Sequence, residues 1–528
     1  MKSLDFLHQN LLEQHRVKIG LFLGPVLFLS IILLPTPQSF ILIAQKTLSA
    51  NAGDTSVIEA AFGTKVVLAL LILMVVWWIT EAIPIPVTSL LPGIILPLFQ
   101  VAGFANGKAY LFDSKAVFSN YSNPVIFLFL GGFLLAAAMR KTELDKRFVL
   151  FILTRGKLAE DSKMILLGIM SVTGFISMWV SNTATAAMML PLGLGIITQM
   201  GIRGSDSKFG KSIMLGIAWS ASIGGVGTII GTPPNGICVS ILSGSGYPKI
   251  SFIDWIKFGL PYVAIFIPVA WYILTKVFPA EIKNISGGKE QLVIQRNNLG
   301  KLKREEKLTI IVFCIAVFLW SGNPFWKYFL PASINNLLSG FDEYVIALFA
   351  AALLFIIPVD LSRHKFVLYW ADTKYVDWGT LLLFGGGIAL SDAMFKTGLA
   401  QWIADAFVSL IGNPSPLVIL LLIVLMVDLL SEVTSNTAVV TMMIPIMISI
   451  AKGIGADPVT LAIGTALGGS LGFMLPVATP PNALVYGTGY LTIKDMIKGG
   501  FLLDISGWLI TIFILYVFAY KIFGIIIL

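Results

Sequence analysis

The sequence predicts an all-α polytopic membrane protein with about eleven transmembrane helices and two re-entrant hairpins in an inverted-topology repeat. Its 528 residues are 57% hydrophobic and only 12% charged, with a mean hydropathy of +0.89, whereas soluble domains carry about 25% charged residues. Apolar runs of about 20 residues, each able to cross a bilayer core of roughly 30 Å, recur along the chain. Three short sequence blocks also occur twice, in the same order.

The composition argues against several classes of function. The net charge of +8 does not indicate nucleic acid, because the basic residues lie in short segments between apolar runs, where they set topology. Cys238 and Cys314 lie in apolar stretches, and the three histidines have no ligand spacing, so neither disulfides nor a Cys/His metal site is expected. The predicted spans hold no nucleophile with a base, so we expect no enzyme.

Apolar runs predict the membrane segments. The start of the chain leads into the first run without a small-residue cleavage site, which predicts a retained helix. Two further apolar stretches, 164–200 and 416–450, each have a polar break near the middle and are predicted as re-entrant hairpins. The eleven predicted spans are 18–35, 63–82, 84–101, 124–139, 213–243, 255–277, 308–328, 342–358, 378–394, 458–490 and 501–526.

Lysine and arginine in short loops predict the orientation. Segments 140–163 and 279–307 hold seven basic residues each, and cytoplasmic loops carry such an excess. Counting spans from these anchors places the N-terminus in the cytoplasm. Segments 140–160 and 359–377 mix basic with aromatic or aliphatic residues, which predicts amphipathic helices along the membrane surface.

The repeat is the most informative pattern. The run 181–191, which begins Ser-Asn-Thr, recurs at 435–445 with an offset of 254. Gly131-Gly132 recurs as Gly386-Gly387 with an offset of 255, and Thr-Pro-Pro-Asn at 232–235 recurs at 479–482 with an offset of 247. The common residues of membrane helices could produce one such match, but not three collinear ones.

Loop charge indicates how the copies are related. The counterpart of the basic segment 140–163, at 395–417, holds only Lys396, so the two copies are expected to face opposite sides. Inverted repeats with helices broken near the bilayer midplane are common in secondary transporters, and the breaks point to the binding site.

The breaks suit an anion and small cations. Helices that begin after the Ser-Asn-Thr loops present free N–H groups and a partial positive charge to carboxylate oxygens. The Pro-Pro breaks leave backbone carbonyl groups without intrahelical partners, and such carbonyls suit a small cation. Unpaired backbone groups are tolerated inside a bilayer only where protein or water binds them. One such loop alone is more often a helix cap, and one Pro-Pro a kink; duplication favours function. Glu432, beside the second break, could bind a cation or proton, but we favour a structural role.

Paired Ser-Asn-Thr loops, each followed by Thr-Pro-Pro-Asn, resemble the divalent anion:sodium symporter family over nearly the whole chain. The resemblance implies a homodimer with scaffold and transport domains that works by an elevator movement. It implies substrate contacts at Asn182, Thr183, Thr232, Pro233, Asn436, Thr437, Thr479 and Pro480. It implies a first sodium site at Ser177, Asn182 and the Gly231 backbone, and a second at Ser431, Thr434, Asn436 and the Ala478 backbone. Ser177 is inferred from its repeat symmetry with Ser431, and Thr434 stands where the family pattern has a small apolar residue.

The resemblance also implies a domain organisation. The expected parts are a cytoplasmic segment (1–17), first scaffold helices (18–123), repeat 1 (124–278), a cytoplasmic linker (279–307), second scaffold helices (308–377), repeat 2 (378–500) and a last transmembrane helix (501–528).

The expected function is sodium-coupled symport of C4-dicarboxylates such as succinate, malate and fumarate, with sodium ions as coupling ions. A sodium-independent dicarboxylate exchanger, and a citrate or sulfate transporter of the same fold, stay open as alternatives. A channel would not need paired hairpins with opposite entry sides. The protein is expected to lie in the lipid bilayer of a bacterial inner membrane. Its expected partner is a second copy of the chain, and no nucleic acid is expected to bind.

Overall fold

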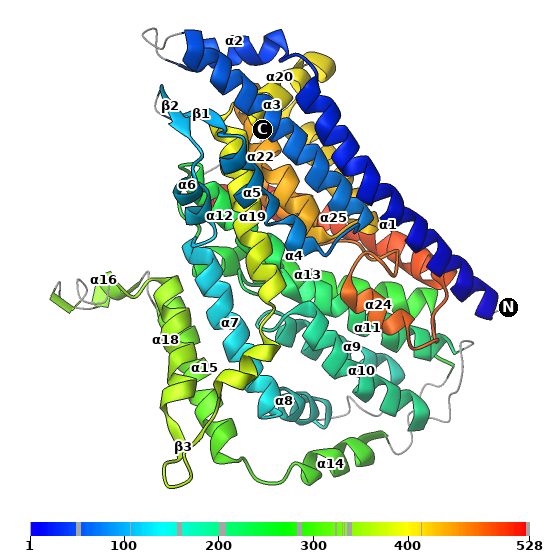
Figure 1. Cartoon of the computed structure of the whole chain (residues 1–528). Helices are drawn as coiled ribbons and strands as arrows, with labels where there is room; N and C mark the ends of the chain where they lie inside the picture. The colour runs from blue at the N-terminus through cyan, green and yellow to red at the C-terminus, as the bar shows by residue number, and fades with distance from the viewer. Residues whose placement is uncertain are drawn as a thin grey trace.

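The fold is seen in a computed structural model (Figure 1). The structure describes residues 2–48, 54–105, 107–155, 161–199, 207–281, 288–322, 325–329, 331, 333–334, 340–412 and 414–523. Part of the predicted linker, 282–287, and the end of the chain, 524–528, lie outside the described residues.

The chain is built almost entirely of helices. The N-terminal part contains α1 (Lys2–Leu33), α2 (Gln38–Thr47), α3 (Asp54–Thr80), α4 (Ile85–Thr88), α5 (Leu91–Leu98), the antiparallel hairpin β1 (Ala102–Ala105) and β2 (Lys108–Leu111), and α6 (Ser114–Asn120). The next part contains α7 (Pro124–Lys141), α8 (Leu144–Leu153), α9 (Ser162–Ser177), α10 (Asn182–Gln199), α11 (Lys208–Gly225), α12 (Pro233–Gly244) and α13 (Phe252–Val277).

The second half repeats this order after a connecting region. That region contains α14 (Gly288–Asn298), α15 (Arg304–Gly322), α16 (Trp326–Phe329), α18 (Glu343–Ile356), the hairpin β3 (Pro358–Asp360) and β4 (Lys365–Phe366), and the 3-10 helix η2 (Trp370–Tyr375). It is followed by α19 (Trp378–Lys396), α20 (Leu399–Ile411), α21 (Pro416–Val433), α22 (Asn436–Ile454), α23 (Pro458–Gly468), α24 (Pro480–Tyr486) and α25 (Ile493–Phe523).

Eight of the described helices are long and apolar enough to cross a membrane. They are His15–Leu33, Ser56–Thr80, Pro124–Lys141, Phe252–Val277, Trp378–Lys396, Pro416–Val433, Asn436–Ile454 and Ile493–Val517. Six of them coincide with predicted single spans, which confirms an all-α polytopic membrane protein. The other two are the arms of the predicted second hairpin, and each is long enough to cross, so its re-entry and the total of eleven spans stay predictions.

Three predicted elements need comment. The run 84–101 is not one helix but α4 and α5, because Pro92 at the start of α5 has no N–H to donate to the carbonyl of Thr88, where α4 ends. The broken helices predicted in 213–243 and 458–490 are confirmed as the pairs α11/α12 and α23/α24.

The helix predicted at 359–377 is wrong. This segment forms a short hairpin and η2, because side chains take over backbone groups: Asp360 accepts from Ser362 N at 3.1 Å, and Asp372 accepts from Tyr369 N at 2.8 Å. The surface helix predicted at 140–160 is present as α8, with 156–160 outside the described residues. Its counterpart in the second half is α20, which was not predicted and begins 255 residues later.

Glycines of the repeated Gly-Gly pair hold two long helices close to their neighbours. A Cβ atom on Gly131 of α7 would lie 2.6 Å from the Ala347 backbone of α18, and one on Gly386 of α19 would lie 1.9 Å from the Ser89 carbonyl oxygen after α4. Such close backbone approach is the usual basis of helix packing in membranes. In Figure 1, α15 and α18 stand beside α7, whereas α3 and α1 pack together elsewhere.

The two halves interlock around the predicted breaks. Helix α12 of the first half packs against α22 and α23 of the second, and α24 of the second half packs against α10 and α11 of the first. Each half therefore contributes one helix to the hairpin of the other.

Candidate functional site: two interrupted helical hairpins

The first hairpin is interrupted where α9 ends and α10 begins. The buried Ser177 hydroxyl lies 2.8 Å from Asn182 Oδ1 and 2.6 Å from the Ala221 carbonyl oxygen of α11. A hydroxyl has one proton, so it can serve only one of these two oxygens at a time. The Thr228 hydroxyl donates to the Met178 carbonyl and closes the end of α9. Two of the predicted first-site residues, Ser177 and Asn182, are therefore in contact.

The first broken helix is organised by Asn235, which is fully buried. Its Nδ2 donates to the carbonyl oxygens of Gly225 at 3.0 Å and Thr228 at 2.7 Å, where α11 has ended and α12 has not begun. A buried carbonyl without a donor is costly. Asn235 thus satisfies the unwound backbone that passes beside the first hairpin.

The second hairpin has buried oxygens without partners. Between α21 and α22, Thr434 Oγ1 and Asn436 Oδ1 are both buried and make no hydrogen bond within the described residues. Asn436 Nδ2 lies 3.4 Å from the Leu471 carbonyl oxygen, and the Ser431 hydroxyl donates to the Asp428 carbonyl at 2.8 Å. Hydroxyl, amide and carbonyl oxygens are the ligands that hard cations prefer, so these residues fit a small cation.

The second broken helix repeats the two main hydrogen bonds of Asn235. Asn482 Nδ2 donates to the carbonyl oxygens of Gly472 at 3.2 Å and Leu475 at 3.0 Å. Each of these three residues stands 247 positions after its partner in the Asn235 arrangement. The fourth residue of Thr-Pro-Pro-Asn therefore has the same structural task in both halves.

Two equivalent glycines bring each break close to its hairpin. A Cβ atom on Gly225 would lie 2.3 Å from Asn182 Oδ1, and one on Gly231 would lie 2.4 Å from the Gly225 carbonyl oxygen. In the second half Gly472 has φ +104°, and a Cβ there would lie 3.2 Å from Ser431 Oγ and 3.5 Å from the Ala478 Cβ. Gly225 thus lies beside Asn182, and Gly472 lies beside Ser431 and Ala478, all of which are predicted sodium residues.

Carboxylates hold the second break. Glu432 accepts from the backbone N–H groups of Met474 at 2.8 Å and Leu475 at 2.9 Å, which agrees with the favoured structural role. Asp504 of α25 accepts from Phe473 N at 3.1 Å. With Asp428, these side chains form a buried cluster whose carboxylate oxygens lie within 4.8 Å of one another. Three successive N–H groups of the unwound chain are therefore satisfied by two acids.

The predicted substrate residues differ in exposure. Thr183 and Pro480 are exposed, whereas Asn182, Pro233, Asn436 and Thr437 are partly buried. Thr232 and Thr479 are buried, and the Thr479 hydroxyl accepts from Asn482 N at 3.3 Å. In the part of the chain that the structure describes, no hydrogen bond joins loop 181–183 to loop 435–437; their helices α10 and α22 contact α24 and α12 of the opposite half.

Several of these residues were not predicted from the sequence. Asn235 and Asn482 stand in the repeated motif, but no role was predicted for them. Gly225, Gly472, Asp428 and Asp504 were not among the predicted residues. The 247-residue offset already pairs Gly225 with Gly472 and was a usable signal. A lone aspartate in the long apolar α25 gives no indication of what it contacts.

A family model described as the sodium:sulfate symporter transmembrane region matches residues 60–525. The chain belongs to this family. Relatives of this sodium:sulfate symporter family member include the "Sodium-dependent dicarboxylate transporter SdcS" of Staphylococcus saprophyticus, 37% identical, with 96% of this chain and 92% of the relative covered. The protein of the same name from Staphylococcus aureus is also 37% identical, with 94% of this chain and 90% of the relative covered.

Two solved structures share the fold of this family member. The YdaH transporter of Alcanivorax borkumensis matches with a TM-score of 0.54 at 13% identity, over 86% of this chain and 98% of that one. MtrF of Neisseria gonorrhoeae, described as one of a class of antimetabolite efflux pumps, matches with a TM-score of 0.53 at 13% identity, over 92% and 98%.

Proposed function

We propose that this protein is a secondary transporter that couples sodium movement to uptake of a C4-dicarboxylate such as succinate, malate or fumarate. The observation that carries the proposal is the pair of buried, unpartnered oxygens, Thr434 Oγ1 and Asn436 Oδ1, beside an unwound helix. Membership of the sodium:sulfate symporter family and the printed names of its staphylococcal relatives support it.

Charge supports the role of cations. The apolar stretches 164–199, 212–244, 416–450 and 458–490 of both hairpins and both broken helices contain no lysine or arginine. The lysines of these helices, Lys163, Lys208, Lys211 and Lys452, lie near the helix ends. A substrate with two carboxylates therefore meets no cationic side chain from these apolar stretches. Bound sodium ions would supply the missing positive charge.

The helix starts supply anion ligands. Helices α10 and α22 begin at Asn182 and Asn436, and the first N–H groups of any helix have no acceptor within it. Such N–H groups and the helix dipole favour a carboxylate. In this proposal Asn182 and Thr183 bind one carboxylate of the substrate and Asn436 and Thr437 the other, with Thr232-Pro233 and Thr479-Pro480 completing the pocket.

The sodium sites follow the same hairpins. The first is formed by Ser177, Asn182 and the Gly231 backbone. The second is formed by Ser431, Thr434, Asn436 and the Ala478 backbone, and its orphaned oxygens make the Thr434 side chain a ligand in this proposal.

The domain division of the proposal is that of an elevator in a homodimer. Segments 18–123 and 308–377 form the scaffold, repeats 124–278 and 378–500 carry the substrate, and the basic segments put the N-terminus in the cytoplasm of a bacterial cell. Support comes from the interlocked packing of α12 with α22 and of α24 with α10, since it links the two hairpins into one body.

The first experiment is uptake of labelled succinate into proteoliposomes, with and without an inward sodium gradient, in empty and in succinate-loaded vesicles. Uptake into empty vesicles that requires sodium supports symport. Uptake only into loaded vesicles, indifferent to sodium, identifies an exchanger and removes both sodium sites. Competition with citrate and sulfate tests the other substrates of the alternative.

Two variants test the site. Asn182→Ala and Asn436→Ala each remove an amide at a helix start, so we expect transport to fall to background while expression stays near normal. Asn298→Ala, at an exposed asparagine of α14, is the matched control and should keep parental uptake. Parental uptake by either site variant would remove its residue from the proposed site.

A further inference from the structure

A basic cavity lies between α8 and the end of α14, and none of its lining residues belongs to either hairpin. Its volume is about 520 Å³. Arg147 and Phe151 of α8 line one wall, and the end of α14 with the following turn lines the other. None of its lining residues is acidic; those of the second wall include Arg296, Asn297, Lys301 and Leu302. Figure 1 places α8 and α14 at the same end of the molecule, and both belong to the lysine- and arginine-rich segments.

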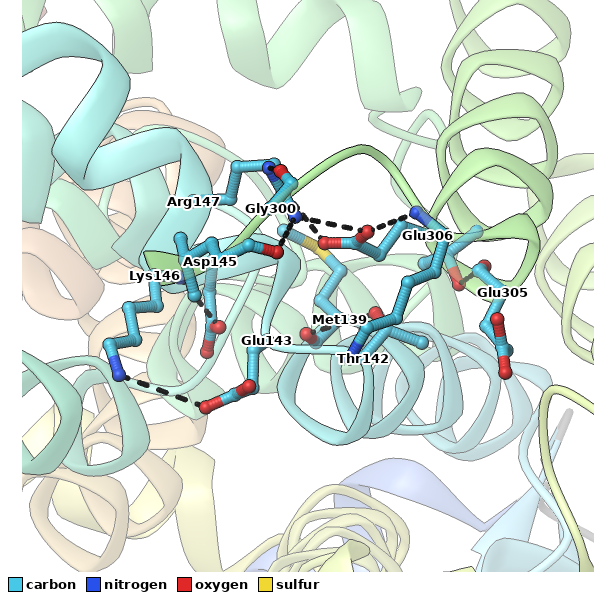
Figure 2. A network of polar contacts seen from close by, with 12 residues as sticks. Met139, Thr142, Glu143, Asp145, Lys146, Arg147, Gly300, Glu305 and Glu306 are labelled. Carbon is cyan, nitrogen blue, oxygen red and sulfur yellow. Dashed lines mark hydrogen bonds and ion pairs between the residues drawn. The ribbon is translucent and has the colours of Figure 1, made fainter. Parts of the chain in front are cut away.

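Arg147, one of the basic residues that line the cavity, is paired with an acidic residue and holds the two walls together. Arg147 donates from Nε to Glu306 Oε1 at 2.7 Å, and its other nitrogens donate to the carbonyl oxygens of Gly300 at 2.8 Å and Leu299 at 3.0 Å (Figure 2). Glu306 is buried and also accepts from Lys303 N at 2.6 Å. This network fixes α8 to the turn before α15, so the cavity has a defined shape.

Two other cations have no acidic partner. Arg296 donates to the Thr154 hydroxyl at 2.9 Å, which is a neutral acceptor. Among the described residues neither Arg296 nor Lys301 forms an ion pair with a carboxylate. Some basic residues elsewhere do have such partners: Lys211 of α11 pairs with Asp495 at 2.8 Å and Lys141 of α7 with Asp372 at 2.6 Å. The cavity therefore keeps an uncompensated positive charge.

The rim of the cavity is apolar and exposed. Phe151 is 44% exposed, Leu302 43% and the nearby Ile294 of α14 55%. The Arg155 guanidinium lies 4.1 Å from the centre of the Phe151 ring, which adds a further cation at the rim. Exposed apolar side chains beside cations are typical of surfaces that lie at the membrane interface.

We propose that this cavity binds the headgroup phosphate of an anionic phospholipid. Arg296 matches phosphate oxygens with its planar fork of donors, and Lys301 supplies a second charge. Phe151, Leu302 and Ile294 contact the upper part of the acyl chains. Basic pockets beside transmembrane helices recognise anionic lipid headgroups by the same chemistry. The bound lipid would join α8 to the segment that connects the two halves.

The test measures lipid binding to the purified full-length protein in nanodiscs of phosphatidylcholine with and without phosphatidylglycerol. The readouts are phosphatidylglycerol retained per protein, by mass spectrometry, and Tm. The pocket variant is Arg296→Gln with Lys301→Gln. The control variant, Lys163→Gln with Lys307→Gln, removes two exposed charges from the same basic segments outside the cavity.

In phosphatidylcholine alone, equal Tm values for the parent and both variants establish that all are folded. With phosphatidylglycerol, we expect the parent and the control to gain Tm. We expect the pocket variant to bind this lipid about twenty-five-fold more weakly, since each of the two basic residues contributes about a factor of five. Equal loss of lipid in both variants would overturn the proposal, because binding would then follow total charge. An equal Tm gain from inorganic phosphate alone would also overturn it, since the ligand would then be free phosphate.

Discussion

Gly225 has no side chain, and this allows the backbone of α11 to lie against the side chain of Asn182. The end of α11 passes so close to the first hairpin that a Cβ atom on Gly225 would lie 2.3 Å from Asn182 Oδ1. We predict that Gly225→Ala displaces the Asn182 amide and lowers succinate uptake at least tenfold. Gly195→Ala, on α10, is the matched control because its Cβ would meet no atom within 4 Å. Parental uptake by Gly225→Ala would show that Asn182 is not held by this contact.

Glu432 supports a second residue-scale prediction. Its carboxylate accepts from two backbone N–H groups of the unwound segment, and leaving a buried donor unsatisfied costs about 1–3 kcal/mol. Glu432→Leu should therefore lower Tm clearly, whereas Glu432→Gln keeps an acceptor oxygen and should lower it less. Thermal unfolding of the detergent-purified variants checks the order. Equal Tm values for Leu and Gln would contradict a hydrogen-bonding role.

Residues of the proposed site stood out where the sequence repeats them. Asn182 and Asn436 stood out because the whole Ser-Asn-Thr block occurs twice, and the structure places each at a helix start. Asp504 could not be predicted, because its acceptor role depends on the approach of α25 to Phe473, and nothing in the local sequence encodes that approach.

At the scale of elements, the surface helices show what local patterns miss. Helix α8 was predicted from its mixed basic and apolar residues, but its equivalent α20 contains no basic residue and was overlooked. The segment 359–377 shows the opposite error, since a surface helix was predicted there from its composition but is absent. The carboxylates of Asp360 and Asp372 accept hydrogen bonds from backbone N–H groups, which favours turns. Broken helices, in contrast, were visible because two adjacent prolines remove two successive backbone donors. Single prolines, such as Pro191 of α10 and Pro445 of α22, lie inside continuous helices.

The contact between α7 and η2 gives a pH prediction. Burial alone would raise the pKa of Asp372, but hydrogen bonds from Lys141 and Tyr369 N, with the nearby lysine charges, hold it below its ordinary value. A lowered carboxylate pKa stabilises the fold above the unfolded value of about 3.9 and loses that contribution as pH falls through the folded pKa.

We therefore predict that Asp372→Asn lowers Tm at neutral pH and removes part of the Tm loss seen on acidification. The effect should be small, below about 1 kcal/mol, because the Lys141 side chain is 30% exposed and the ion pair is screened. Lys141→Met should give the same neutral-pH change, and the double variant no further one. An unchanged acid response in Asp372→Asn would mean that other carboxylates account for all of it.

At the scale of the whole molecule, α12 and α24 each pack against the opposite half. We therefore expect neither half to transport substrate without the other. The halves are joined by α12 on α22 and α23, by α24 on α10 and α11, and by α13 on α25. We predict that a chain divided within 282–287 transports only when both parts are co-expressed, and that the parts co-purify. Succinate uptake in cells that express one part or both checks this. Uptake by either part alone would contradict a shared site.

This packing of helices across the two halves also means that early helices wait for their neighbours during synthesis. Helix α10 is made about 300 residues before α24, which it needs as a neighbour, and at about 5–20 residues per second this interval lasts roughly 15 to 60 s. During that time the polar loop at Asn182 and the unwound end of α11 sit in the membrane without their final covering. Until the second half has been synthesised, these polar groups must therefore be kept from contact with lipid, either by the insertion machinery or by temporary packing within the first half.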